Sequence, residues 1–114
     1  MGYILFVDDE EPLRKMAKHF WGEFGYSVVV KKDGQEALDA FRALPDIFDV
    51  VVTDHTMPRM TGTAVAKEIL QVRPLMPIVL CTGYTDAVDE MAAGEMGIRA
   101  FLMKPVSFLR LVEL

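Results

Sequence analysis

The sequence predicts a single α/β domain built on a parallel sheet, and three observations lead to this fold class. Short apolar runs alternate with segments of helical periodicity through all 114 residues. All six prolines fall at the edges of expected elements, where a missing backbone donor is tolerated. Polar residues follow directly after four of the apolar runs. Five strands alternating with five helices favour right-handed crossovers and a sheet covered on both faces.

Each expected element follows from a local pattern. The strands are short apolar or β-branched runs and cover residues 4–7, 27–30, 49–53, 77–81 and 98–103. The helices carry apolar residues at helical spacing and cover residues 12–24, 34–44, 62–73, 86–96 and 107–114. Residues that favour helix starts, turns and helix ends mark the boundaries, in chain order Pro12, Gly25, Asp33, Gly34, Pro45, Thr61, Gly62, Pro74, Gly97 and Ser107. We expect one domain, 1–114, whose last helix is truncated at Leu114. It is either a stand-alone protein or a domain cut from a larger protein, and the truncated helix favours the second.

Composition narrows the class of protein. With 52% hydrophobic and 25% charged residues, the chain is expected to be globular and soluble. A net charge of -5 without a basic stripe argues against direct nucleic-acid binding. No apolar run approaches the length of a membrane span, and no signal peptide is apparent. The single cysteine, Cys81, lies in an apolar run and cannot pair within the chain, so a cytoplasmic location is expected.

Chemistry-bearing side chains follow four of the expected strands. Asp8 and Asp9 come after the first strand, Asp54 after the third, Thr82 after the fourth and Lys104 after the fifth. Because ligands of parallel sheets bind beyond the carboxyl ends of the strands, we expect these side chains to meet at one edge. The edge would then hold three carboxylates, a hydroxyl and an ammonium group.

This set of groups suits a divalent cation and a phosphoryl group. Carboxylate oxygens are the ligands that Mg²⁺ prefers, and three carboxylates against one ammonium leave a charge that one Mg²⁺ would neutralise. A carboxylate can attack phosphorus to give an acyl phosphate. A cation and Lys104 can stabilise the transferring oxygens, and the Thr82 hydroxyl can bond one of them.

Four segments of the chain resemble the signature of the receiver (response-regulator) domain family. They are residues 6–10 (Phe-Val-Asp-Asp-Glu), 54–62 (Asp-His-Thr-Met-Pro-Arg-Met-Thr-Gly), 82–83 (Thr-Gly) and 101–105 (Phe-Leu-Met-Lys-Pro). The resemblance covers essentially the whole chain. It implies a flavodoxin-like, doubly wound five-stranded parallel sheet with strand order 2-1-3-4-5 and five helices. It also implies a phosphoacceptor domain of a two-component phosphorelay, which receives its phosphoryl group from a histidine kinase or a phosphotransfer domain.

The resemblance assigns a role to each site residue. Asp54 would be the phosphoacceptor, Asp9 a direct Mg²⁺ ligand and Asp8 the holder of a metal-bound water. Thr56 would lend its backbone carbonyl to the metal, for which Mn²⁺ is an expected substitute. Lys104 would contact the phosphoryl group. Such a domain is not a classical enzyme, although it supports its own phosphotransfer and autodephosphorylation.

The resemblance also implies a switch. Thr82 would move toward the phosphoryl group while Phe101 turns inward, and the peptide before Pro105 would be cis. The readout would be a face within residues 87–114 that binds an output domain or a downstream protein. The amino-acid sequence of residues 57–62 and 80–86 is similar to that of receiver domains fused to hybrid sensor histidine kinases.

Other readings of these residues remain open. Paired acids after a strand often only cap a helix, and Phe101 alone would be a core residue. A haloacid-dehalogenase-type, Mg²⁺-dependent aspartyl phosphatase needs Asp-x-Asp, whereas Asp8 is followed two residues later by Glu10, and no cap insertion is present. A receiver-like interaction module without phosphorylation is a further alternative. Such modules usually lack one acid or the lysine, and this chain has all of them.

Overall fold

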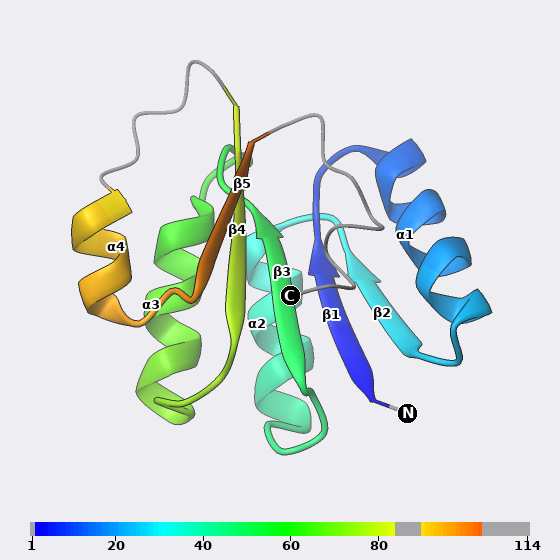
Figure 1. The fold of residues 1–114 in the computed structure, drawn as a ribbon, viewed down its shortest axis with the longest axis horizontal. Helices are drawn as coiled ribbons and strands as arrows, with labels where there is room; N and C mark the ends of the chain where they lie inside the picture. Colours follow the sequence, from blue (N-terminus) through cyan, green and yellow to red (C-terminus); the bar gives the residue numbers. More distant parts are fainter. Residues whose placement is uncertain (1, 84–89, 104–114) are drawn as a thin grey trace.

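The computed structural model describes residues 2–83 and 90–103, in which five strands alternate with four helices (Figure 1). The elements are β1 (Tyr3–Val7), α1 (Glu11–Glu23), β2 (Ser27–Lys31), α2 (Gly34–Ala43), β3 (Val50–Asp54), α3 (Gly62–Val72), β4 (Ile78–Thr82), α4 (Glu90–Met96) and β5 (Ala100–Met103). All strand pairs are parallel, in the order β2-β1-β3-β4-β5. The predicted fold class and strand order are therefore confirmed. The predicted last helix, 107–114, lies outside the described residues.

Helix boundaries follow from residues that cap or end helices. At the start of α2 the Asp33 carboxylate accepts a hydrogen bond of 2.9 Å from the Glu36 N–H. At the start of α3 the Thr61 hydroxyl accepts one of 3.3 Å from the Ala64 N–H. Beyond α1, Gly25 has a φ of 92°, a conformation that glycine adopts without strain. The first three helices thus begin and end close to their predicted positions. None of the helices in the described part of the chain has the length and apolar character needed to cross a bilayer.

All five strands differ by one or two residues from their predicted ranges, with β1 starting at Tyr3 and β2 ending at Lys31. β3 extends through Asp54 and β4 through Thr82, so both side chains are fixed by strand backbone rather than by a loop. β5 begins at Ala100 instead of Ile98. The reason is that the Ile98 N–H donates to the Ala93 carbonyl at 3.1 Å and so closes the turn after α4. This bond removes Ile98 from the sheet ladder.

The core lies on both faces of the sheet. On one face α2 and α3, which lie next to each other in Figure 1, pack over β1, β3 and β4. On the other face α1 contributes Ala17 and Trp21, and the Trp21 ring meets Phe6 edge-on with centroids 5.6 Å apart. In β3 Val50 is half-buried and the four residues that follow it, Asp54 included, are buried.

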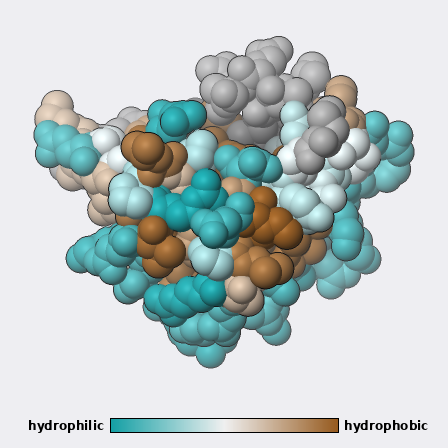
Figure 2. Space-filling model, turned by 90° about the horizontal axis from the view of Figure 1, so that it is seen from below, coloured by the Kyte–Doolittle hydropathy of each residue, from teal (hydrophilic) through white to brown (hydrophobic). Residues whose placement is uncertain are grey.

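The loops at the amino ends of the strands are tied together by one side chain. The Arg73 guanidinium, at the end of α3, donates from Nη1 to the carbonyls of Phe48 at 2.6 Å and Pro45 at 3.1 Å. Figure 2, which views the molecule from below, shows separate hydrophobic areas among hydrophilic side chains at this end. Leu44 and Leu75, in the loops after α2 and α3, are 58% and 89% exposed. The polar site described next lies at the opposite edge.

Candidate functional site

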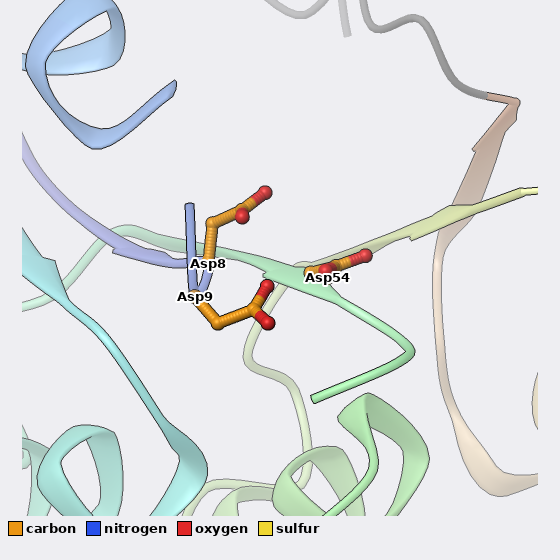
Figure 3. Close-up of side chains that lie close together, drawn as sticks. All are labelled: Asp8, Asp9 and Asp54. Atoms are coloured by element: carbon orange, nitrogen blue, oxygen red, sulfur yellow. The ribbon is translucent and has the colours of Figure 1, made fainter. Parts of the chain in front are cut away.

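Strand register brings acidic residues together at the carboxyl edge of the sheet. Val7 of β1 pairs with Thr53 of β3, so Asp8 and Asp54 are the next residues on adjacent strands. Asp9 follows in the loop after β1. One carboxylate oxygen from each of the three aspartates lies within 4.8 Å of the others, and the side chains converge in Figure 3. The structure thus places these three predicted residues in one cluster.

The cluster is mostly shielded from water. Asp8 is 3% and Asp54 2% exposed, whereas Asp9 is exposed. Carboxylates gathered in such a place repel one another unless a positive charge compensates them. Three hard oxygen donors with one side open to solvent match the preference of Mg²⁺, which takes a few carboxylates and keeps several waters. The donor set therefore fits a divalent cation.

Hydrogen bonds fix the loop that carries the first two aspartates. The Asp8 N–H donates to the Lys31 carbonyl at 3.1 Å, and its Oδ1 accepts from the Glu10 N–H at 2.9 Å. The Asp8 carbonyl accepts from Nη1 of Arg14 at 2.9 Å. Arg14 was not among the predicted site residues. In the sequence it is only a basic residue early in an amphipathic helix, and its contact with Asp8 depends on how α1 is oriented.

The loop after β3 folds back closely on the strand end. The His55 N–H donates to the Cys81 carbonyl at 2.9 Å, and the Gly62 N–H donates to the His55 carbonyl at 2.8 Å. A Cβ on Gly62 would collide with the Asp54 carbonyl oxygen and with Leu80. From the sequence, Gly62 was predicted to start a helix and to end the 54–62 signature segment, with no contact to Asp54 expected. The structure shows that a side chain at this position would displace the backbone of Asp54.

The other predicted site residues within the described part take the following places. Thr82 ends β4, half-buried, one residue past the strand partner of Asp54. Thr56 is exposed in the loop after β3. Phe101 is half-buried and packs against the core cluster that α2 and α3 cover. Of these residues, Thr82 lies at the same sheet edge as the aspartates.

Some predictions concern residues that the structure does not describe. Lys104 and the peptide before Pro105 lie outside the described residues. In sequence Lys104 directly follows Met103, whose backbone is the strand partner of Thr82. Of the expected output face, 87–114, only residues 90–103 are described.

A comparison with known protein families identifies the class of protein to which this chain belongs. The family model of the response regulator receiver domain matches residues 4–114. The chain is a receiver domain. Receiver domains are the phosphoacceptor modules of two-component signalling, and they typically bind Mg²⁺ in an acidic pocket such as the one that Asp8, Asp9 and Asp54 form here.

Individual relatives agree with this assignment. The receiver domain is 32% identical over 111 residues to the chemotaxis protein CheY of Thermotoga maritima, covering 96% of this chain and 91% of that one. It is 36% identical over 110 residues to response regulator RR06 of Streptococcus pneumoniae, covering 96% of this chain and 49% of RR06. The crystal structure of a response regulator receiver domain protein from Clostridium thermocellum matches with a TM-score of 0.91 and 30% identity, covering 97% of this chain and 88% of the other.

Some of these relatives are much longer than this chain. The receiver domain spans about half of RR06, and about a quarter of the transcriptional regulatory protein GlrR of Escherichia coli, which it matches with 35% identity over 91% of its own length. The match therefore concerns the receiver portion of those regulators.

Proposed function

We propose that this receiver domain accepts a phosphoryl group on Asp54 from a phosphohistidine of a histidine kinase or phosphotransfer domain, in a reaction that needs Mg²⁺. The observation that carries the proposal is the convergence of three carboxylates within 4.8 Å at the joined ends of β1 and β3. In the described residues this cluster lies at the carboxyl edge of a doubly wound sheet, where ligands of such folds bind.

Asp54 is suited to be the nucleophile. One carboxylate oxygen of Asp54 forms a bond to phosphorus while the bond between phosphorus and the donor nitrogen breaks. The electron pair of the broken bond stays on the imidazole of the donor histidine. The product is an acyl phosphate, which water hydrolyses to return the carboxylate and inorganic phosphate. Asp54 is the last of four consecutive buried residues of β3, so its position is fixed before the donor arrives. Such a domain supports its own phosphotransfer and autodephosphorylation without being a classical enzyme.

Asp8, Asp9 and Asp54, with the carbonyl of Thr56, would hold the Mg²⁺ ion, and Mn²⁺ is expected to substitute. When bound, the ion neutralises the carboxylates and stabilises charge on the transferring oxygens. Asp9, the exposed member, is open to solvent and suited to direct ligation. Asp8, which is 3% exposed and bonded to the Glu10 N–H, is suited to orient a metal-bound water.

The proposed switch connects the site to α4 and β5. Thr82 at the end of β4 would bond a phosphoryl oxygen, and Phe101, half-buried on β5, would turn inward as Thr82 moves. Lys104 would contact the phosphoryl group, with a cis peptide before Pro105. Within 87–114 the described part exposes two apolar side chains of α4, Met91 and Met96, which supports an output face.

This function places the domain in the cytoplasm beside its kinase. The output domain or downstream protein would bind the face within 87–114. The parent protein is proposed to be a longer regulator, and a hybrid sensor histidine kinase is the candidate that the sequence favours.

A phosphorylation experiment tests the proposal. The protein is incubated with Mg²⁺ and acetyl phosphate and its intact mass is measured promptly, beside an Asp54→Asn variant and a sample with chelator. We expect one added phosphoryl group in the wild type and none in either control. An added mass in Asp54→Asn would place the phosphoryl group elsewhere. No added mass from acetyl phosphate or from a phosphorylated histidine kinase would favour an interaction module without phosphorylation.

A further inference from the structure

Arg14 reaches back from α1 to the loop that carries the acidic cluster. Its Nη1 donates to the Asp8 carbonyl at 2.9 Å, across six residues of sequence, and this hydrogen bond is partly buried. The acceptor is a main-chain oxygen, so the bond fixes the backbone and does not itself occupy a carboxylate oxygen. A charged donor makes such a bond stronger than a neutral one.

The carbonyl that Arg14 holds belongs to the peptide that leads from Asp8 into Asp9. Two further hydrogen bonds of Asp8 run to main-chain groups, from its N–H to the Lys31 carbonyl and from the Glu10 N–H to its carboxylate. The bond from Glu10 closes a turn around the Asp8–Asp9 peptide, and the Arg14 bond holds the carbonyl oxygen of that same peptide. The Arg14 bond fixes that peptide, and its orientation sets the direction in which the Asp9 side chain leaves the chain.

The charge of Arg14 by itself does not favour a bound metal cation at this site. Arg14 lies near the amino end of α1, where a cation gains nothing from the helix dipole. A permanent positive charge beside a cation site also repels the cation. Arg14 also attracts the Glu11 carboxylate, whose pKa is lowered mainly by Lys15 and to a smaller extent by Arg14. That attraction does not involve the acidic cluster, so the contribution of Arg14 to the site is its hydrogen bond to the Asp8 carbonyl.

We propose that Arg14 is a positioning residue for the divalent-cation site, because it orients the peptide between Asp8 and Asp9. The inference rests on the proposed function, since it assumes that this cluster binds Mg²⁺. It gives two opposite expectations for loss of Arg14. If only charge matters, Mg²⁺ binding becomes tighter; if positioning matters, it becomes weaker.

The test compares Mg²⁺ dissociation constants, measured by calorimetry, in the wild type, Arg14→Gln, Arg14→Lys and Lys15→Gln. Lys15 is the matched control because it is the next residue of the same helix and its ammonium pairs with Glu11 at 2.9 Å, away from Asp8. We expect Arg14→Gln to weaken binding about tenfold, a typical cost of losing a group that orients a metal ligand. Arg14→Lys keeps the charge without the planar fork and should also bind more weakly. Lys15→Gln should bind as tightly as the wild type, or slightly more tightly.

A second measurement follows the loop without metal. Amide hydrogen exchange at Glu10, whose N–H bonds the Asp8 carboxylate, should become faster in Arg14→Gln and stay unchanged in Lys15→Gln. Wild-type or tighter Mg²⁺ affinity in both Arg14 variants would overturn the inference. So would a lower melting temperature with unchanged affinity, because Arg14 would then serve the fold alone. A wild type that binds no Mg²⁺ would overturn the proposed function and this inference together.

Discussion

Gly62 lies against the main chain of Asp54 and His55, and no side chain fits between them. A Cβ at Gly62 would come within 2.6 Å of Leu80 Cδ1 and 3.0 Å of the His55 Cα, and still closer to the Asp54 carbonyl oxygen. Leu80 can change its rotamer, but the two backbone atoms can move only if the strand end moves. The absence of a side chain at residue 62 therefore helps to define where the Asp54 carboxylate lies.

Replacing Gly62 by alanine should destabilise the domain. Overpacking against backbone typically costs about 1–3 kcal/mol, and we expect a loss in this range by urea unfolding. Gly22→Ala is the matched control, because a Cβ at Gly22 in α1 would meet nothing within 4 Å. That variant should gain up to about 1 kcal/mol from helix propensity. Equal stability of Gly62→Ala and the wild type would show that the strand end adapts at little cost.

The grouping of the acidic site residues could be predicted from the sequence because strand topology alone determines it. The meeting of Asp8, Asp9 and Asp54 follows from parallel strands that end at one edge, so alternating apolar and helical segments were enough to predict it. The roles of Gly62 and Arg14 depend instead on distances of a few ångströms between a loop and its neighbour. Such distances are set by helix orientation and loop conformation, which residue patterns do not encode.

Among the loops, the one between β3 and α3 carries a strained turn. Arg59 has a φ of 69°, and the Met60 N–H donates to the Pro58 carbonyl at 2.8 Å. A bond from residue i+2 to residue i around a positive φ is the rarer and less favourable form of γ-turn. This loop also contains Thr56, so strain is stored next to the proposed metal site.

Arg59→Gly should relieve this strain. Glycine adopts a positive φ without penalty, although it loses more entropy on folding, so we expect a net gain of up to about 1 kcal/mol in urea unfolding. Arg59→Ala removes the same charged side chain but keeps the Cβ, and it should show no such gain. If alanine stabilised the domain as much as glycine, the effect would come from the lost charge rather than from the backbone.

At element ends that lie within the described residues, prediction was accurate to one or two residues, and the predicted start of the fourth helix at residue 86 lies outside them. Helix starts were clear because Asp33 and Thr61 are strong capping residues and do cap α2 and α3. The start of β5 was placed two residues early because Ile98 looks like a strand residue. Its N–H is taken by the turn after α4, a competition that hydrophobicity does not reveal.

The whole molecule carries a net charge of -5, and part of it is concentrated in one cluster at the sheet edge. A cation bound there stabilises the folded state by mass action, by about 1.4 kcal/mol at ten times its dissociation constant. We therefore expect the melting temperature to rise with Mg²⁺. Potassium chloride at equal ionic strength and an Asp9→Asn variant are the controls. An equal rise with potassium chloride would mean that salt only screens the overall charge.

The loops at the amino ends of the strands lie far from the acidic site, and they offer a position for a label. The loops opposite the site are fastened by Arg73, while Leu75 beside it projects into solvent, 89% exposed. Each strand of five residues is about 17 Å long, so a dye attached at Leu75 would sit about that far from the acidic edge. Such a label would follow tumbling and assembly of the whole domain while leaving the chemistry at Asp54 undisturbed.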